Sequence, residues 1–245
     1  MDRVDKGGKP AGKPVGRRVV LGVTALGALG VAFGAQIENS LNGVLAEINS
    51  KDPTGLTNLL PGGDGFQFYS VASSIPYRSD TDYRLTVGGL VDRPASYTLA
   101  DLQAMPQTKL VKDVQCVTGW RVPNTEFSGV LLSHLLETAG VKPEGKALRF
   151  TCFDGVYSES LTLDEARRPD VMVAHQMDNA PVTRDHGGPV RLYVAPMYFY
   201  KSAKWLSGIT VTDRVMPGYW ENYGYDVEAW IGKSNGRDDA PVDGQ

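Results

Sequence analysis

The distribution of apolar positions predicts that most of the chain after residue 65 forms β-strands. Alternating or β-rich runs lie at Phe66–Val71, Tyr83–Val91, Lys109–Val117 and Ala147–Phe153, and continuously apolar runs at Val171–Gln176 and Val190–Ala195. Alternation is typical of a half-buried strand, and a short continuous apolar run is typical of a fully buried one. Strands therefore dominate the expected fold.

Helical signals are short and stand between these runs. Leu99–Ala104 predicts a helix that is closed by Pro106, because proline cannot continue a helix. The apolar spacing of Gly129–Thr138 predicts a second helix with Gly140 as its stop, and Thr162–Glu165 has the spacing of a capping box that opens a third. Strands scattered among short helices, with no regular strand–helix–strand alternation, predict a β-rich α+β domain.

The N-terminal residues differ from the rest in charge. Residues 1–35 hold six Lys and Arg residues against two Asp, whereas the whole chain of 245 residues has a net charge of −3. The pair Arg17-Arg18 directly precedes a mildly apolar, Gly/Ala-rich run that ends at Ala35. We expect residues 1–35 to be a twin-arginine export signal or an N-terminal membrane anchor, and the protein to be periplasmic or otherwise extracytoplasmic. Because this route carries folded proteins, it favours a cofactor that is inserted before export.

The remaining boundaries follow from composition. Residues 36–65 are expected to be a linker, in which the apolar stripe of Ile37–Ile48 predicts a short amphipathic helix before Pro and Gly residues interrupt the pattern. We place a single functional domain at residues 66–235 and a polar tail at residues 236–245. Hydrophobic residues make up 42% of the sequence, which is enough for a substantial core, and the weakly acidic balance gives no indication of a nucleic-acid partner.

Cys116 stands where a predicted strand gives way to a glycine turn. A thiol at such a corner has a fixed backbone and a side chain that faces open space, which suits a metal ligand or a nucleophile, because the thiolate is the reactive form. Two other interpretations remain open at this point. Free cysteines are commonly small buried apolar residues, and an exported protein could join Cys116 to Cys152 in a disulfide.

A second group of chemically capable residues lies between residues 185 and 205. Arg191 stands in an otherwise apolar strand, where an unpaired guanidinium would be costly, so it requires either an internal carboxylate or a bound anion. Lys201 and Lys204 add two ammonium groups, and adjacent Gly187 and Gly188 let the backbone pass close to a bulky group. Together they predict a phosphate clasp, with a surface lysine pair and an Arg salt bridge as the alternative. The sequence contains no GxGxxG, Walker A, HExxH, GxSxG or CxxC motif.

Three motifs occur in order, Cys116-Val117-Thr118-Gly119-Trp120, His186–Leu192 and Lys201-Ser202-Ala203-Lys204-Trp205. Together with Gly218-Tyr219-Trp220-Glu221 and Gly224-Tyr225, they closely resemble the molybdopterin domain of the sulfite oxidase family. The resemblance runs from Phe66 to Ile231 and is greatest to the bacterial YedY/MsrP-like branch. It implies a molybdenum–molybdopterin cofactor and a two-electron oxygen-atom transfer.

The resemblance also implies a role for individual residues. Cys116 matches the catalytic cysteine whose thiolate completes the coordination of molybdenum beside the pterin dithiolene, and soft sulfur ligands suit such a metal. The positions that match contacts to the pterin or its phosphate are Phe66, Tyr69, Ser70, Gly155, His186, Arg191, Ser202, Ala203 and Lys204.

The departures from the family pattern bear on the substrate. Sulfite oxidases usually follow their cysteine with Gly-Asn and a basic pair, whereas this chain has Trp120 and the single Arg121. An indole and a lost positive charge favour a sulfoxide-like substrate over sulfite. We therefore expect a reductase of the protein methionine sulfoxide type, with a sulfite dehydrogenase as the alternative enzyme and a non-catalytic pterin-binding or scaffold protein as the alternative class. Electrons are expected to be exchanged with a separate protein, such as a membrane haem protein, because the sequence encodes no redox module of its own.

Overall fold

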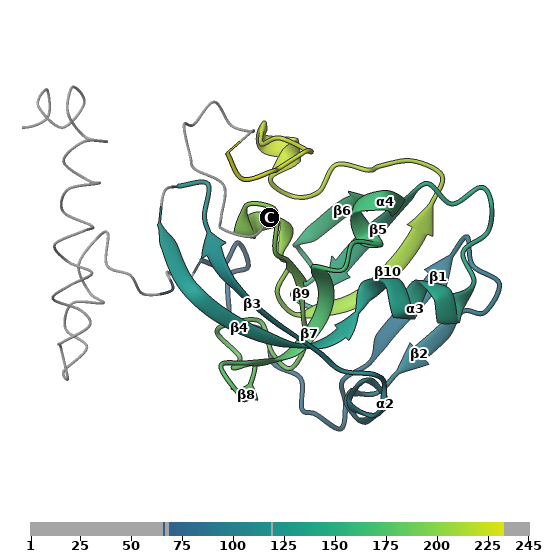
Figure 1. The fold of residues 1–245 in the computed structure, drawn as a ribbon, viewed down its shortest axis with the longest axis horizontal. Helices are drawn as coiled ribbons and strands as arrows, with labels where there is room; N and C mark the ends of the chain where they lie inside the picture. The colour runs from purple at the N-terminus through teal and green to yellow at the C-terminus, as the bar shows by residue number, and fades with distance from the viewer. Residues whose placement is uncertain (1–65, 67–68, 119, 233–245) are drawn as a thin grey trace, which may run out of the picture. The chain divides into compact units, whose positions relative to one another are not determined.

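Two mixed-order sheets, each of five strands, organise the part of the chain that the computed structural model describes, residue 66 and residues 69–118 and 120–232. The first sheet has the order β2-β1-β10-β5-β6 and the second the order β3-β4-β7-β8, with β9 also paired to β7 (Figure 1). The strands of the first sheet are β1 (Leu85–Gly89), β2 (Ala95–Tyr97), β5 (Ala147–Cys152), β6 (Ser158–Thr162) and β10 (Leu206–Thr212). Those of the second are β3 (Thr108–Gln115), β4 (Arg121–Leu131), β7 (Val171–Met177), β8 (Ala180–Pro181) and β9 (Arg191–Val194). Only β1 and β10 pair in parallel among these strands.

Short helices connect the strands. The α-helices are α2 (Leu99–Ala104), α3 (Leu132–Ala139) and α4 (Leu163–Ala166), and the 3₁₀ turns are η2 (Phe199–Lys201) and η3 (Glu221–Tyr223). The predicted β-rich α+β class is thus confirmed. Among the described residues, no helix is long and apolar enough to cross a membrane. The predicted export signal, the Ile37–Ile48 helix and the polar tail lie outside these residues.

Local sequence signals place the helix ends correctly. Thr98 caps α2, since its hydroxyl accepts from the Asp101 N–H at 3.0 Å while the Asp101 carboxylate accepts from the Thr98 N–H at 2.8 Å. The predicted capping box at Thr162 opens α4 in the same way. Gly140 ends α3 in the left-handed conformation at φ 70°, as expected of a glycine stop.

Two predicted elements are wrong. The described residues of the Phe66–Val71 run contain no strand, and that segment instead crosses the functional site. The helix predicted at Gly129–Thr138 begins only at Leu132, because the preceding residues complete β4. Gly129 pairs with Ala174 of β7 so closely that a Cβ atom there would lie 2.1 Å from the Val173 carbonyl oxygen. This backbone contact fixes Gly129 in the sheet.

The central strands β7 and β9 are buried on both faces, and their alternation separates two apolar clusters. Val171 and Val173 face the larger cluster, whereas Met172 and Ala174 face the smaller one. On β9, Tyr193 belongs to the smaller cluster, and the period of two places Arg191 on that same side. The smaller cluster also contacts Cys116, so the second sheet carries the predicted site on one of its faces.

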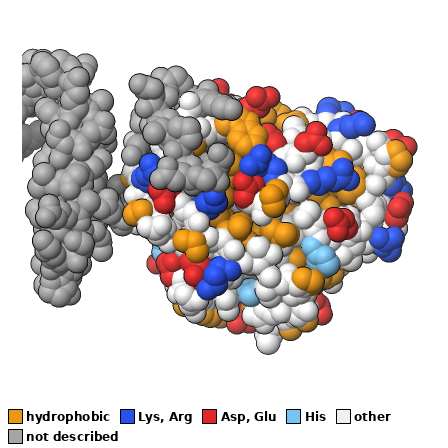
Figure 2. All heavy atoms as spheres, viewed as in Figure 1, with side chains coloured by type: hydrophobic (Ala, Val, Ile, Leu, Met, Phe, Trp, Pro, Cys, Tyr) orange, Lys and Arg blue, Asp and Glu red, His pale blue; other side chains and the backbone are white. Residues whose placement is uncertain are grey.

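Charge is mixed on the surface of the domain. On the face shown in Figure 2, the Lys and Arg side chains of the described residues alternate with Asp and Glu, and they form no continuous basic surface there. This face has no electrostatic footprint of the kind that binds a phosphate backbone.

Candidate functional site

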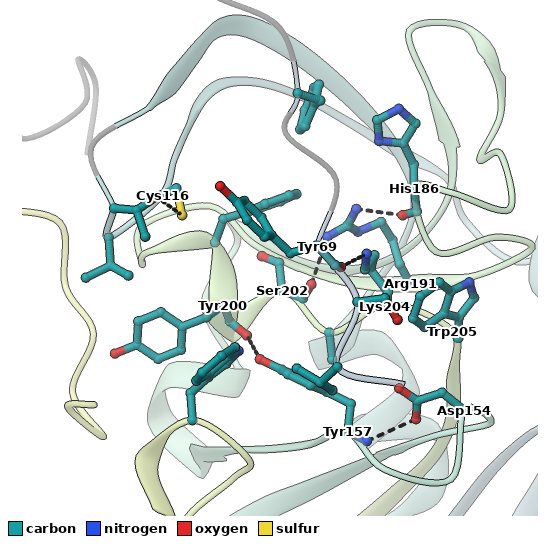
Figure 3. A pocket seen from close by; sticks show the side chains of 18 of the residues that line it. Tyr69, Cys116, Asp154, Tyr157, His186, Arg191, Tyr200, Ser202, Lys204 and Trp205 are labelled. Carbon is teal, nitrogen blue, oxygen red and sulfur yellow. Dashed lines mark hydrogen bonds between the residues drawn. The ribbon is translucent and has the colours of Figure 1, made fainter. Parts of the chain in front are cut away.

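A cavity of about 250 Å³ lies beside the second sheet and brings together nine of the ten residues to which the sequence assigns a role. Those nine are Phe66, Tyr69, Ser70, Cys116, His186, Arg191, Ser202, Ala203 and Lys204. Gly155 does not line the cavity, although its neighbour Asp154 does. The nine residues come from four separate segments of the chain, so only the tertiary structure assembles them (Figure 3).

Cys116 presents its thiol to the cavity directly after β3. Its N–H donates to the Trp120 carbonyl at 2.9 Å, which closes the turn, and the Thr118 hydroxyl donates to its Sγ at 3.2 Å. The thiol is half-buried and free, and Cys152 is also a free thiol, so the disulfide alternative is not found. Burial raises the pKa of Cys152 well above its ordinary value, which leaves that second thiol inert.

Arg191 is a fully buried cation at the other side of the cavity. Its guanidinium donates to the carbonyl oxygens of His186 at 2.7 Å and Ser202 at 2.8 Å, and it lies 4.4 Å from the centre of the Phe199 ring. Among the described residues, no carboxylate is within ion-pair distance of it. Burial lowers the pKa of Arg191 to about 9. Carbonyl dipoles and an aromatic ring thus stabilise the Arg191 guanidinium, but no carboxylate among the described residues compensates its charge. An anion in the cavity would supply that compensation.

Lys204 and His186 add polar groups next to Arg191. Burial, and then the charge of Arg191, lower the pKa of Lys204 to about 7, and the same causes lower the pKa of His186. The Lys204 ammonium donates to the Tyr69 carbonyl and lies 4.6 Å from the centre of the Trp205 ring. All three side chains are disfavoured in their charged form, so a bound anion would favour each protonated state.

Close backbone packing holds this cationic side together. Gly187 has φ +99°, and a Cβ atom there would lie 2.6 Å from the Lys204 Cβ. The Ser202 hydroxyl accepts from the Val194 N–H at 2.9 Å, and the Ala203 carbonyl accepts from the Leu192 N–H at 2.8 Å. The bulky group that Gly187 approaches is therefore the chain's own residue 204 segment, which is clamped against β9, whereas Gly188 packs against the backbone of Val182.

Aromatic rings form much of the remaining wall. Phe66 makes edge contacts with Trp120 at 6.0 Å and His186 at 5.0 Å between ring centres. The Nε1 atom of Trp120 is buried and has no hydrogen-bond partner among the described residues. The rings of Tyr157, Tyr200, Trp220 and Tyr225 also line the cavity, and no role was predicted for them. The sequence contains a signal for two of them, because Trp220 and Tyr225 belong to the Gly218–Glu221 and Gly224-Tyr225 motifs. The motifs do not reveal whether these rings face the cavity or the core.

Lys201, which the sequence placed in the phosphate clasp, and Arg121, which follows the cysteine motif, do not line the cavity. Lys201 is fully buried between two glutamates, so it takes no part in the predicted phosphate clasp. Arg121 forms an ion pair with Asp113, at 2.8 Å from Nε and 2.7 Å from Nη2 to the same carboxylate oxygen. The cationic side of the cavity therefore consists of Arg191 and Lys204, with His186 beside them.

A cavity with a free thiol at one side and the cations Arg191 and Lys204 at the other, set on a β-rich α+β domain, is suited to a cofactor that has both a metal centre and an anionic group. The family model of the oxidoreductase molybdopterin binding domain matches residues 72–220, which is more than half of the chain. The chain belongs to this family of molybdopterin enzymes, the sulfite oxidase family, and to its YedY/MsrP-like branch.

The relatives agree with this assignment. The uncharacterized oxidoreductase YuiH of Bacillus subtilis is 37% identical over 62% of this chain and 77% of its own length. The catalytic subunit MsrP of a protein-methionine-sulfoxide reductase from Ralstonia nicotianae is 31% identical over 56% of this chain and 46% of its own. The crystal structure of the sulfane dehydrogenase SoxCD from Paracoccus pantotrophus superposes with a TM-score of 0.56 at 30% identity, over 59% of this chain and 41% of that one.

The residues present fit a molybdopterin cofactor. Arg191, which is buried without a carboxylate partner among the described residues, and the half-buried ammonium of Lys204 suit a phosphate, which accepts bidentate and point-charge contacts. The thiol of Cys116 supplies a soft ligand of the kind that a molybdenum centre takes.

Proposed function

We propose that this chain is an exported molybdenum oxidoreductase that reduces a sulfoxide-like substrate, with Cys116 as the protein ligand of the metal. The observation that carries the proposal is the cavity itself, which joins a half-buried thiol to the buried Arg191 and the half-buried Lys204, with no carboxylate partner for Arg191 among the described residues. When bound, a molybdenum–pterin centre supplies two-electron oxygen-atom transfer.

Different residues of the chain would hold the phosphate and the metal of the cofactor. Arg191 and Lys204 hold the phosphate end of the cofactor, and Ser202 and Ala203 position it through a backbone segment that is bonded to β9. Cys116 lies toward the opposite side of Figure 3 from Lys204, so different parts of the cavity lining would hold the metal and the phosphate. The Thr118 hydroxyl donates to the Cys116 sulfur at 3.2 Å and thereby fixes the orientation of the thiol.

The lining near Cys116 favours a neutral substrate. Trp120 and Phe66 contribute apolar surface there, and the charge of Arg121 is neutralised by Asp113. An anion such as sulfite would meet no free guanidinium from Arg121, whereas a sulfoxide needs only an apolar wall and a hydrogen-bond donor for its oxygen. Reduction of a sulfoxide consumes two electrons and two protons and yields a thioether and water.

We propose that the electrons come from a separate protein, for which a membrane haem protein is our hypothesis. The sulfoxide part of the proposal is supported by a putative protein-methionine-sulfoxide reductase subunit from Azospira oryzae, which is 28% identical over 82% of this chain. Export by the twin-arginine route is part of the same proposal and rests on the paired arginines before the apolar run.

The test is the molybdenum and pterin content of protein made in a host with an intact cofactor pathway. We expect nearly one molybdenum per chain, with a loss of molybdenum in Cys116→Ser and no loss in the matched variant Cys152→Ser. The metal-loaded protein is then assayed with sulfoxides and with sulfite. A folded protein without molybdenum would refute the cofactor proposal, and turnover of sulfite but not of sulfoxides would refute the substrate proposal.

A further inference from the structure

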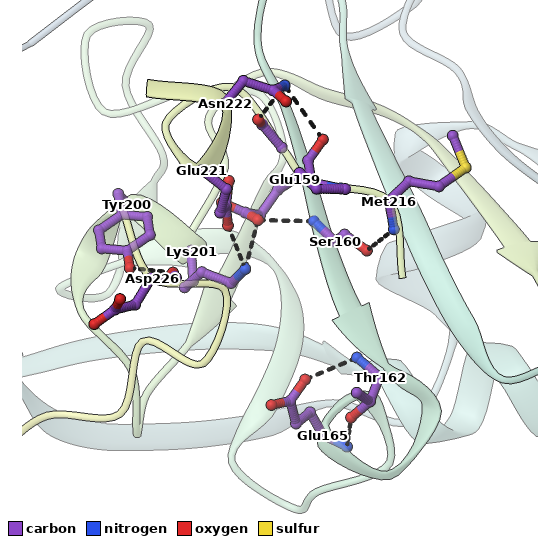
Figure 4. A network of polar contacts seen from close by, with 12 residues as sticks. Glu159, Ser160, Thr162, Glu165, Tyr200, Lys201, Met216, Glu221, Asn222 and Asp226 are labelled. Carbon is purple, nitrogen blue, oxygen red and sulfur yellow. Dashed lines mark hydrogen bonds and ion pairs between the residues drawn. The ribbon is translucent and has the colours of Figure 1, made fainter. Parts of the chain in front are cut away.

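Lys201 forms the centre of a buried triad with Glu159 and Glu221. Its ammonium lies 2.6 Å from the Glu159 Oε1 and 2.6 Å from the Glu221 Oε1, and the three side chains are 0–1% exposed (Figure 4). The partners come from β6 and η3, which are 42 and 20 residues away in sequence. The triad therefore joins three distant parts of the chain inside the domain.

The triad holds one more acid than base. Two ionised carboxylates and one ammonium would leave a net negative charge in a site without water access, which is strongly unfavourable. The second oxygens of Glu159 and Glu221 are both buried and have no hydrogen-bond partner among the described residues. Burial raises the pKa of Glu159 well above its ordinary value, Lys201 opposes this shift and the adjacent Glu221 adds to it, so the protonated form of Glu159 is favoured relative to a free carboxyl group.

The triad lies directly behind the wall of the cavity. Tyr200 and Trp220 directly precede Lys201 and Glu221, Tyr157 lies two residues before Glu159, and the three aromatic residues all line the cavity. The short covalent connections place the triad next to the segments that carry these rings.

The triad is one of several attachments of residues 218–226. This segment contributes Trp220 and Tyr225 to the wall, and the two rings lie 5.1 Å apart. The Tyr219 N–H donates to the Ser158 carbonyl at 2.9 Å, the Asp226 carbonyl accepts from the Tyr200 hydroxyl at 2.6 Å, and the rings of Tyr219 and Tyr225 pack against those of Tyr157 and Tyr200. Glu221 adds the charged contact of the segment, and removing its cation would leave a buried carboxylate there uncompensated.

We propose that Glu159, Lys201 and Glu221 are positioning residues that share one proton and hold residues 218–226 in place as a wall of the cavity. The attachment itself is independent of the cofactor and the substrate. Its consequence for substrate binding rests on the proposed function. Two other titratable groups near Glu159 are Tyr157 and Cys152, and burial raises the pKa of each well above its ordinary value, so neither adds a charge at physiological pH.

Hydrogen–deuterium exchange of the purified holo-protein tests the attachment without any activity measurement. Lys201→Met leaves two buried carboxyls without their cation, and we expect exchange of the amides of residues 218–226 to accelerate on the order of 100-fold. Glu159→Gln imitates the protonated acid, because its amide oxygen can still accept from Lys201 and its amide group can donate to Glu221. We expect it to change exchange less than about 3-fold. Lys109→Met is the matched control, because it removes an exposed ion pair to Glu126 and should leave residues 218–226 unchanged.

The pH dependence separates a shared proton from a merely structural ion pair. Because the pKa of Glu159 is higher in the folded state than in the unfolded state, protection of residues 218–226 should be full at low pH and should fall as pH rises through the folded pKa. Glu159→Gln should abolish this slope. If Glu159→Gln accelerates exchange as much as Lys201→Met, or if it keeps the slope of the wild type, the shared proton is refuted.

Gly218→Ala supplies a variant that leaves all charges in place. A Cβ atom at Gly218 would lie 2.6 Å from the Glu221 Oε2 and 2.6 Å from the Ser158 carbonyl oxygen, so the segment must move. With molybdenum content normalised, we expect both Gly218→Ala and Lys201→Met to raise KM for the sulfoxide roughly 10-fold or more with a smaller change in kcat. Faster exchange without a change in KM would refute the positioning role while leaving the proposed function intact, whereas absence of all turnover in the wild type would refute the proposed function alone.

Discussion

Replacing Arg191 by Met should weaken cofactor retention far more than it weakens the folded apo-protein. The side chain is 1% exposed and makes two short hydrogen bonds, to the carbonyl oxygens of His186 and Ser202. Losing charged hydrogen bonds of this kind costs about 1.5–3 kcal/mol each, or about 3–6 kcal/mol for the pair.

The same substitution removes a buried charge, and that gain offsets the loss. Burial lowers the pKa of Arg191 from 12.5 to about 9, which corresponds to about 5 kcal/mol of unfavourable free energy in the charged state. The two contributions nearly cancel, so the free energy of unfolding of the apo-protein should change by no more than about 2 kcal/mol. In the holo-protein no such cancellation occurs, because the anion that compensates Arg191 is lost together with the charge.

Urea denaturation of the apo-protein and molybdenum content of the holo-protein, after identical dialysis, measure the two quantities. We expect Arg191→Met to lose molybdenum at least about 10-fold faster than the wild type. Arg191→Lys is the matched control that keeps the charge but cannot reach both carbonyls, and it should retain an intermediate amount. An apo-protein destabilised by more than about 4 kcal/mol, with molybdenum retained by the folded fraction, would show that Arg191 serves the fold and not the cofactor.

Two further predictions concern the cationic side of the cavity. Because the pKa of Lys204 is lowered from 10.5 to about 7, the unfolded state binds more protons between these values, and the apo-protein should gain stability as pH rises through this range. The proposed contact of Lys204 with the cofactor requires the charged amine, so cofactor retention should fall above pH 7. Lys204→Met is the control, and it should retain the cofactor equally at pH 6 and pH 9. Gly187→Ala should cost more than about 3 kcal/mol in urea denaturation, because its Cβ would overlap residue 204, whereas Gly155→Ala, with no atom within 4 Å, should cost about 1 kcal/mol. Equal costs at the two glycines would refute the clamp.

Much of the fold could be predicted wherever the determining contacts are local. The capping residues of α2 and α4 and the glycine stop of α3 act within four residues, so the sequence places them correctly. The start of α3 could not be placed in this way, because Gly129 belongs to β4 through a contact with β7, more than forty residues away. The strands β4, β6 and β10 were not predicted for the same reason, because pairing with distant strands places their residues in the sheets.

The candidate site shows the same division. Residue types and motif order were sufficient to select Cys116, Arg191 and Lys204 and to associate them with one family of cofactor enzymes. They were not sufficient to exclude Lys201, which stands in the same motif as Lys204 and carries the same charge. The difference arises because two glutamates from distant segments enclose Lys201.

The sequence by itself thus determined which chemical groups this protein has and the family to which it belongs, because motifs and local capping signals depend on neighbouring residues. The tertiary structure alone decided which of those groups face the cavity and which are buried in pairs. It made Arg121 a partner of Asp113, it placed Asp154 rather than Gly155 at the cavity, and it turned Lys201 away from it. The physical reason is that a charged side chain takes the orientation in which its desolvation is compensated, and the compensating groups lie far away in the chain.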